Sequence, residues 1–264
     1  MKRNNSIALC CIGRMENLYA REFVEHHIGV GFDKIIIADN NHDGEEHFDD
    51  VIQDHIDTGH VRIEDFRNLE NAQRTAYNML YSKYGSSFSW LAFFDFDEFL
   101  FVEGGRNIKD LLFSCPSSFD CMMFPWMMMS DSGLVRYDSR PLVERFTKKA
   151  ADYNLGKSIV RGGFSGLAFT GSVHVPYKPV LHCCTPSYRP TRQHRTQPND
   201  YSVAYLKHFS TKTIEEWLTN KCKKGTAGRS FERFKEHYKD YFFQINERTQ
   251  EKEQFIKDFN NRKI

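Results

Sequence analysis

The sequence predicts an α/β fold in which a mostly parallel sheet is flanked by helices. In about the first hundred residues, short apolar runs typical of strands alternate with segments whose apolar residues recur at helical spacing. Each helical segment is followed by a glycine and then by the next apolar run. This order is typical of parallel strands joined by right-handed crossovers, which place a ligand site at the carboxyl ends of the strands.

Four strands and three helices make up the expected parallel part. The strands are expected at 6–12, 33–39, 60–65 and 89–95, and the helices at 19–30, 48–56 and 70–84. In the first helix, Tyr19, Phe23 and Val30 fall on one apolar face. The glycines that follow the three helices are expected to end them, and they are Gly31, Gly59 and Gly85.

The rest of the chain is less regular. A short helix is expected at 107–114, and strands are expected at 119–124, 157–161, 179–184 and 203–209. Residues 185–199 are rich in Pro, Thr, Arg and Gln and are predicted to form a long loop of the kind that often serves as a lid. Thr213 and Glu216 fit a capping box that begins a helix through Cys222, with Gly225 after it.

The C-terminal segment differs in composition from the rest. Residues 229–264 are dense in charge and carry aromatic residues at near-helical spacing, which predicts one or two amphipathic helices. We therefore expect one α/β domain over 1–228 and a helical appendage over 229–264. The appendage could pack on the core, lie on a membrane surface or form a dimer contact, and packing is the first expectation.

Charge and cysteine content exclude several classes of partner. The chain has 264 residues, of which 36 are basic and 35 acidic, so no global field attracts nucleic acid. The seven cysteines include no Cys-x-x-Cys pair, which disfavours a zinc site and predicts buried thiols in a reducing compartment. The sequence shows neither the apolar core of a signal peptide nor a run of about eighteen apolar residues, which predicts a cytoplasmic protein.

An acidic cluster follows the fourth predicted strand. Asp95, Asp97 and Glu98 interrupt an apolar run, and burying carboxylates is costly unless a cation compensates. In an extended segment Asp95 and Asp97 would point to the same side, where both could bind one divalent ion, Mg²⁺ or Mn²⁺. A solvated strand end is the alternative, and the flanking aromatic residues disfavour it.

Several motifs in order resemble a known group of enzymes. The run Trp90-Leu91-Ala92-Phe93-Phe94-Asp95-Phe96-Asp97-Glu98-Phe99 is similar to the DxD-containing strand end of GT-A fold glycosyltransferases. The resemblance is strongest to the group that includes glycosyltransferase family 92 and bacterial family 2-like sugar transferases. The other matching segments are Arg14-Met15-Glu16, 31–35, 39–41, Gln73, 76–78, 157–161, and His208 with Lys212. Together they cover roughly residues 6 to 225.

The resemblance implies a GT-A, Rossmann-like domain and a metal-dependent glycosyltransferase. It implies a nucleotide-sugar donor, with a UDP-sugar favoured, and a hydroxyl acceptor on a glycan or a lipid-linked glycan. It also implies inversion at the anomeric carbon. The predicted cytoplasmic location, without a spanning helix, favours a place in surface polysaccharide biosynthesis. Peripheral contact with the inner membrane face and homo-oligomerisation are further expectations. The metal, Mn²⁺ or Mg²⁺, would be bound by Asp95, Asp97 and His208, with His174 the second choice for the histidine.

The expected donor site combines residues at the ligand edge of the sheet. Its members are Arg14, Glu16, Asp39, Gln73, Asp95, Lys157 and Arg161. Arg14 leaves the first strand where a diphosphate would lie, and Asp39 ends the second strand, where the resemblance implies a contact with the nucleoside. Lys157 and Arg161, four residues apart on one strand, are expected to form an anion clamp, with a solvated strand face as the alternative. A helix-capping role is equally open for Glu16.

An inverting displacement also needs a carboxylate base near the acceptor. Asp131, in the loop after Pro125-Trp126, is the first candidate, and its alternative is an aspartate that only forms a turn before Ser132-Gly133. Glu98 and Glu144 are further candidates.

Two other classes of function remain open at this stage. A non-catalytic nucleotide- or carbohydrate-binding module would lack a metal cluster or a base, and the intact Asp95 and Asp97 pair argues against it. A nucleotidyltransferase or metal phosphatase also presents acids at strand ends. A nucleotidyltransferase needs a glycine-rich phosphate loop after the first strand, for which Gly13-Arg14 is too short.

Overall fold

A computed structural model describes residues 5–177, 181–191, 199–224 and 231–261. The chain divides into two compact units, each made of two segments. The first contains Met1–Trp126 and Asn154–Lys207, and the second contains Met127–Tyr153 and His208–Ile264. The expected division at residue 228 differs from this grouping, because the second unit joins the C-terminal helices to a segment from the middle of the chain.

The sheet has the order β3-β2-β1-β4-β7-β6-β10-β5. Its strands are β1 (Ile7–Gly13), β2 (Lys34–Asp39), β3 (Val61–Asp65), β4 (Trp90–Phe93), β5 (Glu98–Val102), β6 (Cys121–Met128), β7 (Gly156–Arg161) and β10 (Ala204–His208). Strands β1 to β4 pair in parallel, while β7 runs antiparallel to both β4 and β6. The predicted α/β class with a parallel sheet flanked by helices is confirmed.

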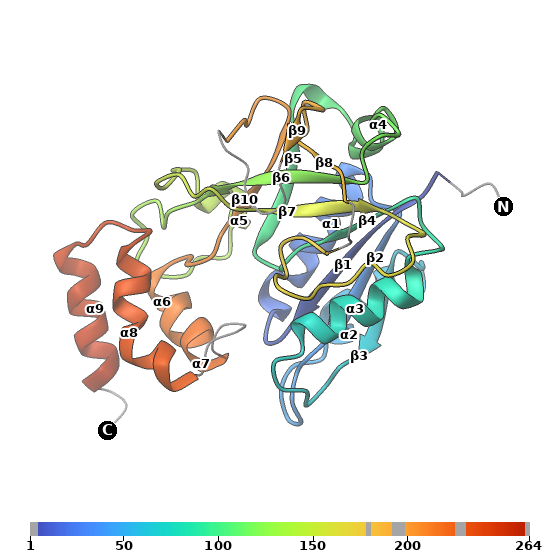
Figure 1. Cartoon of the computed structure of the whole chain (residues 1–264). Coiled ribbons are helices and arrows are strands. Elements are labelled where there is room, and N and C mark those ends of the chain that lie inside the picture. Colours follow the sequence, from blue (N-terminus) through green and yellow to red (C-terminus); the bar gives the residue numbers. More distant parts are fainter. Residues whose placement is uncertain (1–4, 178–180, 192–198, 225–230, 262–264) are drawn as a thin grey trace. The chain divides into compact units, whose positions relative to one another are not determined.

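Three crossover helices connect the parallel strands (Figure 1). They are α1 (Asn17–Val30), α2 (Asp49–Asp57) and α3 (Gln73–Tyr84). Gly31 ends α1 in the left-handed conformation, with φ of 118°, as predicted. The path β1-β2-β3 runs outward in one direction, so right-handed crossovers place α1 and α2 on one face of the sheet. The crossover from β3 back to β4 runs the other way and places α3 on the opposite face.

The core under α3 follows from strand alternation. Ala8 and Cys10 of β1 point to the same face and pack with Tyr77 and Leu80 of α3 in one apolar cluster. All seven cysteines are free, and Cys10 is fully buried, so the expectation that the thiols serve as small apolar side chains holds for it.

The order of the strands creates a topological switch point between β1 and β4. The chain leaves β1 towards β2 and β3 and then returns to β4 on the other side of β1. Crossover connections therefore diverge at the carboxyl ends of β1 and β4, which is where open α/β sheets bind ligands. Arg14, Asp39 and Asp95 follow or end three of these strands.

Other elements depart from the predicted bounds. Strand β4 ends at Phe93, and β5 follows the acidic residues, although no strand was predicted there. Helix α4 (Ile108–Phe113) matches the short helix expected at 107–114, and the 3-10 turn η1 (Glu103–Gly105) precedes it. Within the strand predicted at 179–184, the structure has the short strand β8 (Cys183–Cys184). Within the loop predicted at 185–199, it has the short strand β9 (Pro190–Thr191), which pairs antiparallel with β8. Residues 178–180, 192–198 and Gly225 lie outside the described residues.

The second unit contains α5 (Leu142–Arg145), α6 (Ile214–Glu216), η2 (Trp217–Lys221), α7 (Cys222–Lys224), α8 (Phe231–Phe243) and α9 (Gln250–Asn261). The predicted capping box is confirmed, because the Glu216 N–H donates to Thr213 Oγ1 over 3.2 Å. Phe242 of α8 and Ile256 of α9 pack against Trp217, so the amphipathic helices have a packed apolar face. Among the described residues, the helices are too short or too polar to cross a bilayer.

Candidate functional site

The acidic residues after β4 form a tight turn. The Glu98 N–H donates to the Asp95 carbonyl over 3.0 Å, and the Asp95 N–H donates to Glu98 Oε2 over 3.0 Å. The prediction that Asp95 and Asp97 lie in an extended segment is wrong, since these two bonds close the chain into a turn. Glu98 then begins β5, so the turn is held between two strands.

An aromatic side chain anchors this turn to the sheet. Phe96 stacks on Phe48 with ring centroids 5.2 Å apart and lies 4.7 Å from Phe23. It also covers Gly13 at the end of β1, where an added Cβ would meet the Phe96 ring at 2.6 Å. The absence of a side chain at Gly13 therefore lets Phe96 fix the acidic turn against the carboxyl end of β1.

Asp95 is held by three side chains. Its Oδ1 accepts from Gln73 Nε2 (2.7 Å) and from the Tyr77 hydroxyl (2.9 Å), and its Oδ2 accepts from Lys157 Nζ (2.9 Å). Burial raises the pKa of Asp95, but the positive charge of Lys157 and the hydrogen bonds from Lys157 and Tyr77 together outweigh burial and leave the pKa below its usual value. Asp95 is therefore an oriented carboxylate.

Several carboxylates gather around Lys157. The lysine is fully buried, and its Nζ lies 3.6 Å from Oε1 of the equally buried Glu98. Burial lowers the pKa of Lys157, but Asp95, Glu98 and Asp97 together raise it above its usual value. Burial raises the pKa of Glu98 well above its usual value, and the neighbouring Asp95 and Asp97 add to that increase.

A group of potential metal ligands lies at this turn. The ligand atoms of Asp97, Glu98 and His208 lie within 4.8 Å of one another, and all three residues are buried. His208 is the last residue of β10, whose other residues belong to the first unit. Two carboxylates and an imidazole suit Mn²⁺, and the carboxylates also suit Mg²⁺. This group contains Glu98 rather than Asp95, which was the other acid expected beside Asp97 and His208.

The alternative histidine lies elsewhere in the fold. His174 Nδ1 lies 3.2 Å from the Gly156 carbonyl, and its ring meets Trp126 edge-on with centroids 5.0 Å apart. These contacts suit a structural histidine beside β7.

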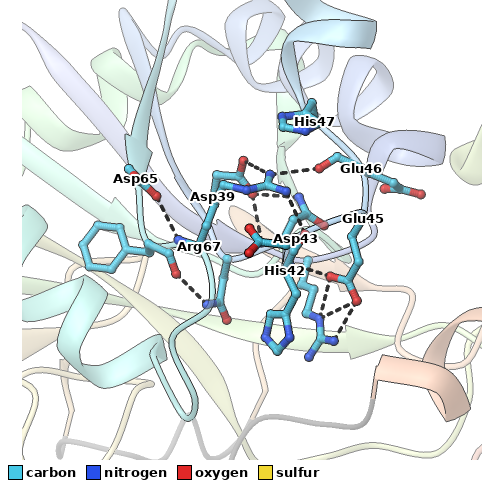
Figure 2. Close-up of polar contacts among 12 residues, drawn as sticks. Asp39, His42, Asp43, Glu45, Glu46, His47, Asp65 and Arg67 are labelled. Atoms are coloured by element: carbon cyan, nitrogen blue, oxygen red, sulfur yellow. Dashed lines mark hydrogen bonds and ion pairs between the residues drawn. The ribbon is translucent and has the colours of Figure 1, made fainter.

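Asp39 belongs to a network at the carboxyl ends of β2 and β3 (Figure 2). Its Oδ1 accepts from both the backbone N–H (2.9 Å) and the side-chain amide (2.7 Å) of Asn41, and its Oδ2 accepts from Arg67 (2.9 Å). Asp39 is only 5% exposed. Asp39, the expected nucleoside-binding aspartate, is therefore held in a largely buried hydrogen-bond network.

Arg14 is paired with an acid from the loop after β2. Its Nε and Nη2 donate to the carboxylate of Glu45 over 2.9 and 2.7 Å. The hydrogen bonds from Arg14 lower the pKa of Glu45 to about 2. Met15 has a positive φ of 54° and donates its N–H to Asn41 Oδ1, which ties the loop after β1 to the loop after β2. Glu16 is buried beside them at the start of α1.

Comparison with known proteins identifies the family. A model of glycosyltransferase family 92 matches residues 7–251. The chain belongs to this family. No curated protein matches it.

Solved structures show weaker similarity. The S. aureus TarS 1–349 structure in complex with UDP-GlcNAc has a TM-score of 0.39 and 8% identity, covering 50% of this chain and 37% of that chain. S. aureus TarS 1–349 alone has a TM-score of 0.40 and 8% identity, covering 59% and 47%. Rv0371c from Mycobacterium tuberculosis H37Rv has a TM-score of 0.32 and 8% identity, covering 48% and 68%. The chain thus spans less than half of either TarS chain.

In this family 92 protein, the two residues of the expected anion clamp lie at opposite ends of β7. Lys157 lies at the acidic turn, whereas Arg161 pairs in register with Trp90, at the amino end of β4. The Arg161 guanidinium donates to the carbonyls of Phe119 (2.7 Å) and Cys115 (2.9 Å) and covers the Trp90 ring. The structure therefore brings Lys157 to the candidate site at the carboxyl end of β4, and it places Arg161 at the amino end of that strand.

The first candidate for the expected base, Asp131, is buried in the second unit. Its Oδ2 pairs with Lys252 of α9, and its Oδ1 accepts from the Gly133 N–H over 2.9 Å. Its own N–H donates to Asn246 Oδ1 over 2.6 Å. These contacts favour the alternative interpretation, in which Asp131 forms a turn and anchors it to the C-terminal helices.

Three residues of the site were missed by the sequence analysis. Tyr77 lies one helical turn after Gln73, and that spacing predicts that both reach the same carboxylate. Arg67 follows β3 at the edge where Arg14 follows β1, so the same argument from a fixed charge at the ligand edge would have found it. Glu45 had no local signal, because its pairing with Arg14 spans 31 residues.

Proposed function

We propose that this family 92 glycosyltransferase transfers a sugar from a nucleotide sugar, with a UDP-sugar favoured, in a reaction that depends on Mn²⁺ or Mg²⁺. The observation that carries the proposal is the acidic turn at the carboxyl end of β4. Asp95, Asp97 and Glu98 cluster there around Lys157, beside the topological switch point of the sheet. Such a concentration of acids, of which Asp97 and Glu98 are buried, is suited to a divalent cation.

Asp97, Glu98 and His208 would hold the ion, and Asp95 would orient the turn or contribute an oxygen. When bound, the ion would act as a Lewis acid that stabilises negative charge on the departing diphosphate. Gln73, Tyr77 and Lys157 would keep Asp95 in a single orientation while the donor enters.

The donor would lie along the carboxyl ends of β1, β2 and β4. Arg14 offers a fixed positive charge for the diphosphate, which would compete with Glu45 for the guanidinium. Asp39 and the loop after it would bind the nucleoside. Arg161 is not needed in this arrangement, since its guanidinium already binds backbone carbonyls.

The acceptor would be a hydroxyl on a glycan or a lipid-linked glycan, attacked with inversion, in surface polysaccharide biosynthesis. The inversion in this proposal rests on the family resemblance, and the place in surface polysaccharide biosynthesis rests on the predicted cytoplasmic location. Peripheral contact with the inner membrane face and homo-oligomerisation are proposed from the amphipathic C-terminal helices. For the base, Asp131 and Glu98 stay the proposed residues. Glu98 would fill that role in place of holding the ion, and the Lys252 pairing weighs against Asp131.

Isothermal titration of the purified protein with UDP and with GDP, each with and without Mn²⁺, tests the proposal. UDP should bind in the presence of Mn²⁺ and lose that binding in Asp97→Ala. The matched control is Asp50→Ala, which removes an exposed acid on α2 and should bind UDP like the parent protein. If neither nucleotide binds under any condition, the proposed metal and donor site is wrong.

A further inference from the structure

The loop after β2 is held in place by a residue from the next strand. Strand β3 ends at Asp65, whose Oδ1 accepts from the Arg67 N–H over 3.0 Å. The chain turns at this point, and the Phe66 N–H donates to the Asp39 carbonyl over 2.9 Å. The turn directs the Arg67 side chain back towards the end of β2, as Figure 2 shows.

The Arg67 guanidinium joins three points of this loop. Nη1 donates to Asp39 Oδ2 (2.9 Å) and to the Glu46 carbonyl (3.0 Å), and Nη2 donates to the His42 carbonyl (2.8 Å). The Arg67 side chain is only 17% exposed and that of Asp39 only 7% exposed, so the pair is largely shielded from water. Hydrogen bonds of this kind between charged groups are short and directional.

The same network reaches the loop after β1. Asp39 holds Asn41 through two hydrogen bonds, and Asn41 Oδ1 accepts from the Met15 N–H over 2.7 Å. Met15 follows Arg14, which is the proposed diphosphate contact. Arg67 therefore holds Asp39 directly, and through Asp39 and Asn41 it also holds the backbone beside Arg14.

We infer that Arg67 is a positioning residue for the donor, which shapes the loop 39–46 before the nucleotide arrives. This inference rests on the proposed function, because it assumes that the loop receives the nucleoside of the donor. Lysine would not replace the arginine, since a single ammonium lacks the planar fork that spans one carboxylate and two carbonyls. A preformed loop lowers the ordering cost of binding, so the loss of Arg67 would weaken donor binding and leave the acidic turn unchanged.

The test measures the dissociation constant of UDP at saturating Mn²⁺ and, separately, that of Mn²⁺ without nucleotide. Arg67→Gln should weaken UDP binding by about tenfold to a hundredfold, the range in which small misplacements act, and should leave the Mn²⁺ constant unchanged. Arg67→Lys should lie between Arg67→Gln and the parent protein. The control is Arg62→Gln, which removes an exposed arginine of β3 that pairs with Glu64 and should bind UDP normally.

Thermal melting of each variant separates positioning from folding. If Arg67→Gln fails to fold, Arg67→Lys carries the test by the same two constants. Unchanged UDP binding in a folded Arg67 variant would overturn the inference, as would a parallel loss of UDP and Mn²⁺ affinity in both variants. If the parent protein binds Mn²⁺ but no nucleotide, the proposed function fails, and the inference fails with it.

Discussion

Two buried lysines of this family 92 protein each face an aspartate, and their surroundings differ. Lys157 of β7 pairs with Asp95 and lies among further acids, at the carboxyl end of β4. Lys252 of α9, inside the second unit, pairs with Asp131 and also donates a hydrogen bond to the Glu247 carbonyl. The several acids around Lys157 are not neutralised by one lysine, so a further positive charge would stabilise them. The single pair of Lys252 and Asp131 is balanced in charge, and it anchors a loop to a helix.

The comparison can be tested by removing each lysine in turn. Lys157→Met should lower the free energy of unfolding by about 3–5 kcal/mol, because it leaves buried carboxylates without their partner. Mn²⁺ should recover part of that stability, since a bound ion supplies the missing positive charge. Urea denaturation with and without Mn²⁺ measures both effects.

Lys252→Met is the matched variant. It should lose a similar amount of stability, about 3–5 kcal/mol, and Mn²⁺ should leave that loss unchanged. Equal rescue of both variants by Mn²⁺ would show that the ion acts on the protein in general and would remove the distinction between the two lysines.

Asp131→Asn addresses the acid of the second pair. Removing one charge from a buried pair should cost about 3 kcal/mol in the free energy of unfolding, seen as a lower melting temperature. A general base would instead show a loss of about 10² to 10⁴ in kcat with unchanged stability. The second pattern would restore Asp131 as the base and contradict the structural role assigned to its pair with Lys252.

Much of the parallel half of the fold was predictable, since its signals are local. Apolar periodicity and the glycines after each helix located β1 to β4 and their crossovers within a few residues. Strand β5 was missed because the acids of the turn interrupt an apolar run and resemble a strand end. The Asp131 to Lys252 pair joins residues far apart in the sequence, and no local pattern indicates it.

The candidate site was predictable in composition and less so in geometry. The sequence located the acids, Lys157 and Arg14, because each follows or lies on a strand at the ligand edge. It grouped Lys157 and Arg161 in one anion clamp, whereas the two residues lie at opposite ends of β7. Two side chains on one face of a strand need not lie at the same end, and four residues span about 13 Å. Arg67 was missed because its partner Asp39 lies 28 residues earlier in the sequence, and no local pattern joins the two.

Gly13→Ala tests whether the shape of the acidic turn depends on the packing of Phe96 over Gly13. The added Cβ would meet the Phe96 ring at 2.6 Å, so the variant should lose about 1–3 kcal/mol of stability and bind Mn²⁺ more weakly. Gly29→Ala in α1 is the control, as an added Cβ there has no neighbour within 4 Å. It should gain up to about 1 kcal/mol in the unfolding free energy measured by urea. Normal Mn²⁺ binding by Gly13→Ala would mean that Phe96 does not set the turn.

A buried histidine offers a smaller test of β5, the strand that carries Glu98. His27 Nδ1 lies 2.8 Å from the Phe23 carbonyl, and Nε2 accepts from the Leu100 N–H, so the ring is neutral. Burial, together with the adjacent His26, lowers the pKa of His27 well below its ordinary value of 6.5.

The direction of the pH dependence of stability follows from proton uptake at His27. Below pH 6.5 the unfolded chain binds a proton at His27 that the folded protein does not, so stability is complete above that pH and falls as the pH decreases towards the lower folded-state pKa. The slope from this residue should reach at most about 1.4 kcal/mol per pH unit. Urea denaturation of the parent protein and of His27→Gln between about pH 7.5 and about pH 5 should give a shallower slope for the variant. Identical slopes would mean that His27 is not kept neutral by the fold.

The most direct test of the acidic turn is a titration with Mn²⁺ followed by electron paramagnetic resonance, with and without UDP. The account predicts one bound Mn²⁺ per chain in the parent protein, tighter binding when UDP is present, and loss of the bound ion in Asp97→Ala. Free Mn²⁺ throughout the titration of the parent protein, or equal binding by Asp97→Ala, would contradict it.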